Sequence, residues 1–371
     1  MENIPKVNNF DLLRLAAALQ VALNHSAQHL KSNPQGGAMF GLTSLFPGVP
    51  IFFFISGFLI SRAFENNPVP REFALNRILR IYPALVCCFL VSLLMVWTTG
   101  YLSAVHPSIG SVATWALAQV SIGQFYNPDF LRDYGVGVLN GSVWTISVEL
   151  QFYLLVPVLY AGLALDQASS LCSNRRLLVL SMLFLLANRA YVLGGPHHAG
   201  ETWYKLAGVS FIPWVYMFLV GVLAQRNFQM IRPYLAGRFS LTLIAYCAFV
   251  WPLSSIFGWS LGNDLNPPFF CALAVLIFSA AFSHPGLSDS VLHRNDISYG
   301  VYLYHMPIVN LLLALGFGGT VGSLLLAMAA TILLALCSWI GVEKPALRLK
   351  RHALYNHTVG QAGMQAAQKP G

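Results

Sequence analysis

The stretch that decides the fold is FDLLRLAAALQVALNHSAQHL, residues 10–30, an apolar run of the length that crosses a bilayer. It contains two ionisable side chains, Arg14 and His25. At about 100° per residue their spacing is three helical turns plus a small remainder, so one helix face carries both, about 16 Å apart along the axis. A charge in hydrocarbon costs at least about 2.5 kcal/mol on insertion scales, so this pair is a candidate for chemistry.

The rest of the chain has the same apolar character. Hydrophobic residues make up 56% of the 371 residues and charged residues only 9%, whereas soluble domains average about 25% charged residues. The sequence therefore predicts an all-α, polytopic helix bundle in the lipid bilayer. The net charge of +8 does not indicate nucleic acid, because the basic residues are scattered in alternate loops between apolar runs, the pattern that orients a membrane protein.

Ten runs have near-membrane length: 10–30, 45–63, 78–99, 142–165, 177–194, 207–225, 239–258, 267–283, 297–317 and 320–342. An eleventh, 111–124, is shorter and interrupted by polar residues. If 111–124 is not counted as a membrane crossing, most basic residues lie on one side of the membrane, including the tail from Lys344 to Arg351. The positive-inside rule requires this arrangement. We therefore expect ten transmembrane helices, both termini in the cytoplasm, and 111–124 as a re-entrant or interfacial segment.

Two segments outside these runs have distinct compositions. The segment from about 100 to 141 is rich in Gly, Asn, Asp and Tyr and faces outward on this topology, which suits equally a carbohydrate surface and an ordinary extracytoplasmic loop. The end of the chain, 352–371, is rich in Gln, Ala and Gly, which predicts a disordered cytoplasmic tail. We expect 1–351 to form one membrane-embedded domain.

Depth within the membrane indicates which polar side chains can meet. His25 lies roughly 22 Å in from the cytoplasmic side, and Glu149 about 10 Å below the outer boundary of a core about 30 Å thick, so they lie at nearly one level. Arg189 falls about 18 Å in and His305 about 12 Å, nearer the cytoplasm. Because a carboxylate fixes the tautomer of an imidazole and stabilises the imidazolium, His25 with Glu149 predicts a general base. A structural polar contact is the alternative, and for Arg189 alone we favour it.

A second basic pattern is RILRIYP, residues 77–83, at the cytoplasmic mouth of the third run. Arg77 and Arg80 share a helix face, and the bidentate guanidinium fork suits phosphate. From spacing alone, arginines that snorkel to the positive-inside surface are the better interpretation.

Five stretches, in order along the chain, resemble the bacterial acyltransferase-3 family of multi-pass membrane O-acyltransferases. They are Asp11 to His25, FFFISGF at 52–58, RILRIYP at 77–83, WTISVE at 144–149 continuing through Phe152 and Tyr153, and SYGVYLYHMP at 298–307. Each stretch is a weak signal alone, but five in sequence are strong.

The resemblance implies transfer of an acyl group, commonly acetyl, from cytoplasmic acyl-CoA to a hydroxyl of an extracytoplasmic or lipid-linked glycan, in the bacterial cytoplasmic (inner) membrane. It implies acetyl-CoA or another acyl-CoA as donor co-substrate and no metal, and it leaves the oligomeric state open. The residues it assigns to catalysis are Arg14, His25 and Glu149. It assigns Arg77 and Arg80 to the CoA phosphates. We further expect Ser298, Tyr302 and His305 at the donor site and Trp144 and Tyr153 at the acceptor site.

We expect the pantetheine arm of CoA to run past His305 to the level of His25. There His25, oriented by Glu149, takes the proton of a sugar hydroxyl, and the alkoxide attacks the thioester. A covalent acyl-protein intermediate stays open as a variant. The competing class is a proton-coupled transporter that uses His25, Glu149 and Arg189 as a relay, and CoA binding or thioester hydrolysis would separate the two classes.

Overall fold

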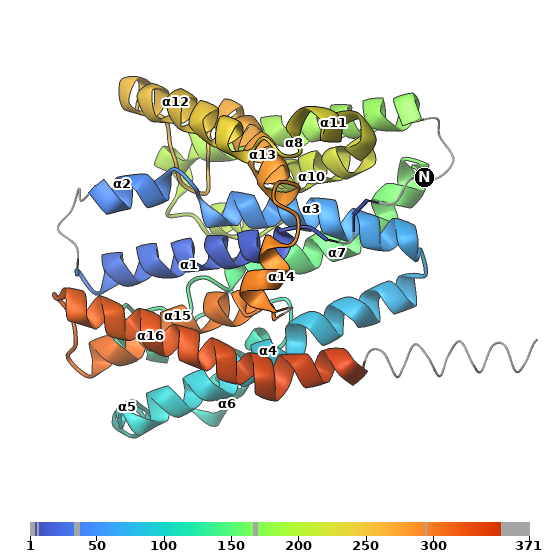
Figure 1. Ribbon diagram of the computed structural model, residues 1–371. Coiled ribbons are helices and arrows are strands. Elements are labelled where there is room, and N and C mark those ends of the chain that lie inside the picture. Colours follow the sequence, from blue (N-terminus) through green and yellow to red (C-terminus); the bar gives the residue numbers. More distant parts are fainter. Residues whose placement is uncertain (1–3, 6, 33–37, 166–169, 294, 350–371) are drawn as a thin grey trace, which may run out of the picture.

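The computed structural model describes residues 4–5, 7–32, 38–165, 170–293 and 295–349, and every regular element in these ranges is helical (Figure 1). The ten predicted apolar runs fall on α1 (Phe10–His29), α3 (Gly48–Asn66), α4 (Pro70–Thr98), α7 (Trp144–Gly162), α8 (Ser170–His198), α10 (Val215–Arg226), α12 (Phe239–Phe257), α13 (Pro267–Ala281), α15 (Ser298–Ala314) and α16 (Val321–Ser338). The expected tail, 352–371, lies outside the described residues.

Shorter helices connect these long ones. They are α2 (Ala38–Ser44), α5 (Tyr101–Val105), α6 (Ile109–Gln119), α9 (Thr202–Gly208), α11 (Phe228–Leu235) and α14 (Leu287–Leu292), together with a 3-10 turn at Asp129–Leu131 and a π turn at Trp339–Glu343. The segment 111–124 thus falls mostly on α6, whose length of about 16 Å is half the thickness of a hydrocarbon core of about 30 Å.

Six helical stretches within the described residues are long and apolar enough to cross a membrane: Gly41–Asn66, Pro70–Thr98, Trp144–Gly162, Leu171–His198, Phe239–Phe257 and Val321–Leu349. Two further apolar helices, α10 and α13, are shorter. The predicted helical membrane fold is therefore confirmed. The count of ten crossings and the cytoplasmic placement of both termini stay predictions.

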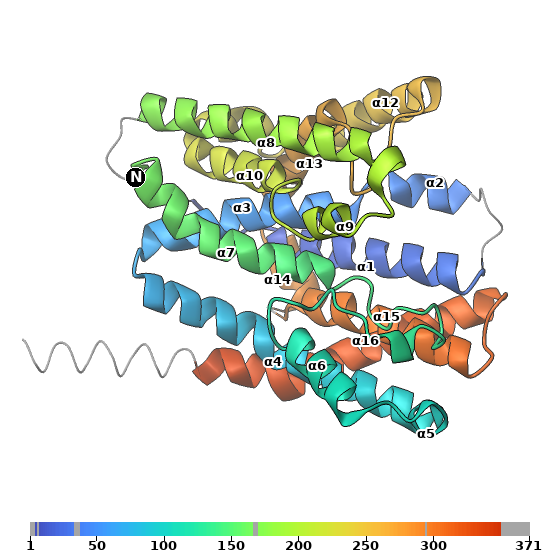
Figure 2. The same cartoon turned by 180° about the vertical axis from the view of Figure 1, so that it is seen from behind.

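The long helices run roughly parallel or antiparallel to one another, with α1 and α3 in the middle of the bundle (Figures 1 and 2). On one side of this pair lie α8, α10, α12 and α13, and on the other lie α4, α15 and α16. Helix α1 packs against both α3 and α15. A side chain on α1 can therefore meet residues that are distant in sequence.

Two glycines bring the backbones of α3 and α10 into contact. A Cβ atom at Gly57 would overlap the carbonyl oxygen of Phe218, and one at Gly221 would overlap the carbonyl oxygen of Phe54. Small residues allow this close approach between membrane helices, where packing rather than the hydrophobic effect holds helices together. The absence of a side chain at Gly57 and at Gly221 therefore allows α3 and α10 to pack in direct backbone contact.

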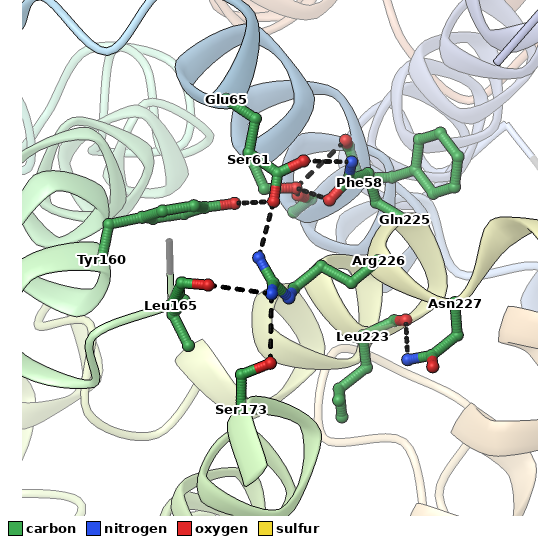
Figure 3. A network of polar contacts seen from close by, with 11 residues as sticks. Phe58, Ser61, Glu65, Tyr160, Leu165, Ser173, Leu223, Gln225, Arg226 and Asn227 are labelled. Carbon is green, nitrogen blue, oxygen red and sulfur yellow. Dashed lines mark hydrogen bonds and ion pairs between the residues drawn. The ribbon is translucent and has the colours of Figure 1, made fainter. Parts of the chain in front are cut away.

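A polar network ties together the C-terminal ends of α3, α7 and α10 (Figure 3). One carboxylate oxygen of Glu65 accepts hydrogen bonds from Arg226 at 2.7 Å and from the hydroxyl of Tyr160 at 2.8 Å, and the other accepts from Gln225 at 2.7 Å. Arg226 also donates to the hydroxyl of Ser173 on α8 at 3.1 Å. Glu65 therefore joins three helices, and Arg226 extends the network to a fourth, α8.

Replacing Glu65 with alanine should lower the free energy of unfolding by about 2–3 kcal/mol, because Arg226 and two further donors lose their acceptor where the Glu65 side chain is only 20% exposed. Glu65→Gln keeps one acceptor oxygen and should lose less. The matched control is Glu201→Ala, which removes a surface pair with His198 and should change stability far less. Unfolding in detergent measures all three, and equal effects of Glu65→Ala and Glu201→Ala would contradict this role.

The predicted orientation can be tested with two single cysteines at exposed positions. Asp133→Cys, in the segment before α7, should react with a membrane-impermeant thiol reagent added to intact cells. Ser240→Cys, at the start of α12, should react only after the membrane is permeabilised. The unsubstituted protein supplies the background from its own cysteines. Labelling of Ser240→Cys from outside would reverse the predicted topology.

Candidate active site

Two histidines from different helices meet inside the bundle. Nδ1 of His25, on α1, lies 3.1 Å from Nε2 of His305, on α15. The hydroxyl of Ser142, which precedes α7, lies 3.2 Å from the same nitrogen of His25 and 3.0 Å from that of His305. Because His305 and Ser142 are both buried, the three groups satisfy one another rather than water.

This triangle of contacts restricts the protonation of His25. Its hydrogen-bonding contacts with His305 and Ser142 both use Nδ1, and within the described residues its Nε2 has no hydrogen-bond partner. When Nδ1 carries the proton and donates it to His305 or Ser142, Nε2 keeps a free lone pair. His25 is then a base with one nitrogen held by the protein and the other available to a ligand.

His25 lines the largest of the described cavities around this cluster, with a volume of about 600 Å³, which lies in the range of small-molecule sites. The walls come from α1, the start of α3, the residues before α7 and the segment before α13. Its polar lining residues include Gln20, Asn24, His29 and Asn263, and none of its lining residues is Asp, Glu, Lys or Arg. The cavity therefore suits an uncharged ligand that can exchange hydrogen bonds.

A smaller cavity of about 50 Å³ lies beside the first and shares Val49 and Tyr302 with it. The Tyr302 hydroxyl lies 2.7 Å from that of Thr145 and donates to the carbonyl oxygen of Ser142 at 3.0 Å, while its ring meets the ring of Phe52 edge-on. Tyr302 therefore stands between the two cavities and belongs to the walls of both.

The smaller cavity is lined by charged residues, among them Arg14 and Arg80. Asp296, just before α15, pairs with both: one carboxylate oxygen lies 3.7 Å from Arg14 and hydrogen-bonds Arg80. Its other oxygen accepts from the backbone and hydroxyl of Ser298 at 3.2 and 2.5 Å. The sequence analysis missed Asp296, although an aspartate immediately before the predicted run 297–317 is a capping signal.

Glu149 also lines the smaller cavity, and it lies away from His25. A single carboxylate oxygen of Glu149 accepts two hydrogen bonds, one from the Ser56 hydroxyl at 3.0 Å and one from the Tyr153 hydroxyl. Glu149 stands seven residues beyond Ser142, or about 10 Å along α7. The prediction that Glu149 orients His25 is therefore wrong for contacts within the described residues, and His305 and Ser142 occupy that position.

The expected depth of His305 is also wrong. Asp296, just before α15, pairs with Arg14, so α15 begins beside a residue that already lies one turn inside α1. From Ser298 to His305 α15 rises about 10 Å, and this brings His305 to His25. His305 therefore belongs to the histidine pair.

The remaining predicted residues occupy different surroundings. Arg77 lies against the rings of Phe73 and Tyr153, at 5.5 and 5.6 Å from the ring centres. Trp144 lines the His25 cavity. Arg189 donates to Asn188 at 3.0 Å and to the backbone of Asp264 at 3.5 Å.

Arg189 contacts neither His25 nor Glu149 within the described ranges, so the three residues proposed as a transporter relay do not form one chain of contacts. The transporter alternative thus finds no support in the site.

The described residues contain no group of three His, Cys, Asp or Glu side chains placed to hold a metal ion.

The fold and the site define a polytopic membrane protein in which a histidine pair stands at the wall of an uncharged cavity, beside a smaller cavity lined by Arg14, Arg80 and Glu149. The family model described as an acyltransferase domain matches residues 7–342. The chain therefore belongs to the acyltransferase-3 family, as its sequence motifs predict, and it is a membrane acyltransferase.

Several characterised proteins are similar along most of the chain. Nodulation protein 10 of Rhizobium leguminosarum bv. viciae is 31% identical, over 92% of this chain and 94% of that protein. The O-acetyl transferase of Shigella phage Sf6 is 27% identical, over 91% of this chain and 96% of that protein. The peptidoglycan O-acetyltransferase OatA of Listeria monocytogenes is 24% identical, over 96% of this chain and 57% of that protein. No solved structure matches.

Proposed function

We propose that this protein transfers acetyl or another acyl group from cytoplasmic acyl-CoA to a hydroxyl of an extracytoplasmic or lipid-linked glycan, in the bacterial cytoplasmic membrane. The names of the phage and Listeria relatives, an O-acetyl transferase and a peptidoglycan O-acetyltransferase, support oxygen as the acceptor atom and a glycan as the substrate. The observation that carries the proposal is the His25, His305 and Ser142 triangle at the wall of an uncharged cavity.

In the proposed reaction the acceptor hydroxyl lies in the His25 cavity. Nε2 of His25 takes its proton, and the oxygen attacks the thioester carbonyl. The bond between the carbonyl carbon and sulfur then breaks, and the CoA thiolate takes the proton from the imidazolium. His305 and Ser142 accept from Nδ1–H of the imidazolium, which is the role first assigned to Glu149.

The donor side of the reaction is the smaller cavity with its basic residues. Arg77 and Arg80 are proposed to engage the CoA phosphates, with Arg14 and Ser298 further along the path. Glu149 holds Tyr153 and Ser56 in the wall and therefore acts as a positioning residue. A thioester that passes from this cavity to His25 must displace the ring of Tyr302, because that ring lines both cavities.

Purified protein tests the proposal directly. Mixed with acetyl-CoA and an acceptor glycan, it should release free CoA thiol in step with acetylation of the glycan, which mass spectrometry detects. Surface glycans from cells with and without the gene should differ by the same acyl group. Absence of CoA release in the presence of a broad glycan mixture would overturn the proposal.

Conservative substitutions test the donor site. Arg77→Lys and Arg80→Lys keep the positive charge but lose the planar fork, so both should raise the acyl-CoA concentration needed for half-maximal transfer, by about tenfold for one lost charged hydrogen bond. Arg71→Lys, on the exposed start of α4, is the matched control and should change nothing. Identical donor dependence in all three variants would return Arg77 and Arg80 to a role in membrane orientation.

A further inference from the structure

A third cavity, of about 210 Å³, takes no part in the steps above. Its walls come from α4, α6, the segment that follows α6 and the residues just before α7. It shares Gly141 and Trp144 with the His25 cavity, so the two cavities meet at one tryptophan ring. A ligand that fills both would pass directly beside Ser142.

The lining of this cavity combines aromatic rings with side-chain amides. The rings are Phe89, Trp115, Phe125, Tyr126 and Trp144, and the amides are Gln119, Gln124, Asn127 and Asn140. Aromatic faces pack against the C–H faces of a sugar ring, and amides both donate to and accept from its hydroxyls. The combination is suited to a saccharide.

The absence of charged side chains in this cavity distinguishes its ligand from the anionic acyl-CoA donor. None of the residues that line the cavity is Asp, Glu, Lys, Arg or His. An anionic group would lose its hydration there without gaining a cation, so neither a CoA phosphate nor a uronic acid is favoured. An uncharged sugar has no such penalty.

The amides are held in place, and one acceptor is left over. Asn127 donates to the backbone of Gly137 at 2.9 Å and accepts from that of Leu139 at 3.2 Å, which fixes the wall. Asn140 donates to the backbone of Leu303 at 2.9 Å, but its Oδ1 is buried without a hydrogen-bond partner in the described residues. A buried acceptor without a donor is unfavourable, and a rotation of the amide toward the cavity that Asn140 lines would let a ligand hydroxyl satisfy it.

We infer that this cavity is a second acceptor subsite, which binds an uncharged sugar ring next to the ring that is acylated in the His25 cavity. The inference rests on the proposed function and adds that the acceptor is an oligosaccharide rather than a single sugar. Trp144, at the junction, would contact both rings.

The test measures binding separately from catalysis. Tyr126 is 40% exposed at the cavity, and a cysteine there should react with a water-soluble maleimide. N-acetylglucosamine tetramer, as an uncharged probe, should slow labelling of Tyr126→Cys at least threefold, and should do so equally when His25 is also replaced by alanine. The monomer should protect less, and a galacturonic acid tetramer should not protect. Leu117→Cys, which is exposed on α6 and outside the cavity lining, is the matched control and should be unprotected.

Kinetics give a second measurement. Tyr126→Ala should raise KM for the uncharged tetramer about threefold to tenfold, the range for one aromatic contact, and should leave KM for acetyl-CoA unchanged. Leu117→Ala should alter neither constant. Absence of protection by the tetramer, or equal protection by the anionic tetramer, overturns the subsite. Protection without any acetyl transfer would leave the subsite standing and overturn the proposed function.

Discussion

His25→Ala is expected to lower the rate of acyl transfer by about 10²–10⁴-fold, which is the usual contribution of a general base. The protein should still accumulate in the membrane, because His25 already borders a cavity and its removal only widens that space. Turnover should be measured at saturating acyl-CoA and saturating acceptor, so that the loss reports on the chemical step rather than on binding.

His197→Ala is the matched control, since it removes an exposed histidine at the end of α8 and should keep full activity. The turnover of His305→Ala should lie between that of His25→Ala and that of His197→Ala. Nε2 of His25 remains in this variant, but the partner that fixes the tautomer of His25 is lost. Wild-type turnover in His25→Ala would remove the base from the proposed reaction.

Asp296→Ala is expected to have the largest effect on stability. It leaves Arg14 and Arg80 inside the bundle without the carboxylate that both face, and breaking one partner of a buried ion pair costs about 3–5 kcal/mol. This loss is a large fraction of the net stability of a typical protein, which is about 5–15 kcal/mol, so the variant should accumulate poorly. Membrane levels and the temperature of unfolding in detergent measure the loss.

A second substitution distinguishes charge from packing in this cluster. Asp296→Ala combined with Arg14→Met removes the guanidinium that has no other carboxylate within salt-bridge distance in the described residues, whereas Arg80 keeps Glu343 at 3.9 Å, and it should recover part of the lost stability because an apolar replacement avoids desolvation of the charge. Asp129→Ala is the control, since its pair with Arg132 is fully exposed and should contribute almost nothing. Failure of the double variant to exceed Asp296→Ala would mean that Asp296 acts mainly by filling space.

The sequence allowed the helices to be predicted because each long apolar run must satisfy its own backbone hydrogen bonds in lipid. Periodicity along one helix also placed Arg14 and His25 on one face. The family motifs added His305, whose contact with His25 is the centre of the site.

The contacts between helices could not be predicted in the same way. Depth counted from the ends of apolar runs assumes that every helix begins at the membrane surface. Helix α15 begins beside Arg14, one turn into α1, so the count separated His305 from His25 and left Glu149 as the expected partner of His25. Ser142 gave no signal, because a single serine before a helix is common and its value depends on which imidazoles approach it.

The glycine contact between α3 and α10 has a mechanical consequence. Neither helix can slide along or rotate against the other without driving a side chain into a carbonyl group, so the two move as one rigid body. We therefore expect any displacement of Tyr302 to come from a change of rotamer on the other wall, where its hydroxyl contacts Thr145 and Ser142. Gly300 also brings α15 close to the backbone of Ala335 on α16, so we expect the helices to form a fixed frame in which the Tyr302 side chain is the part that moves.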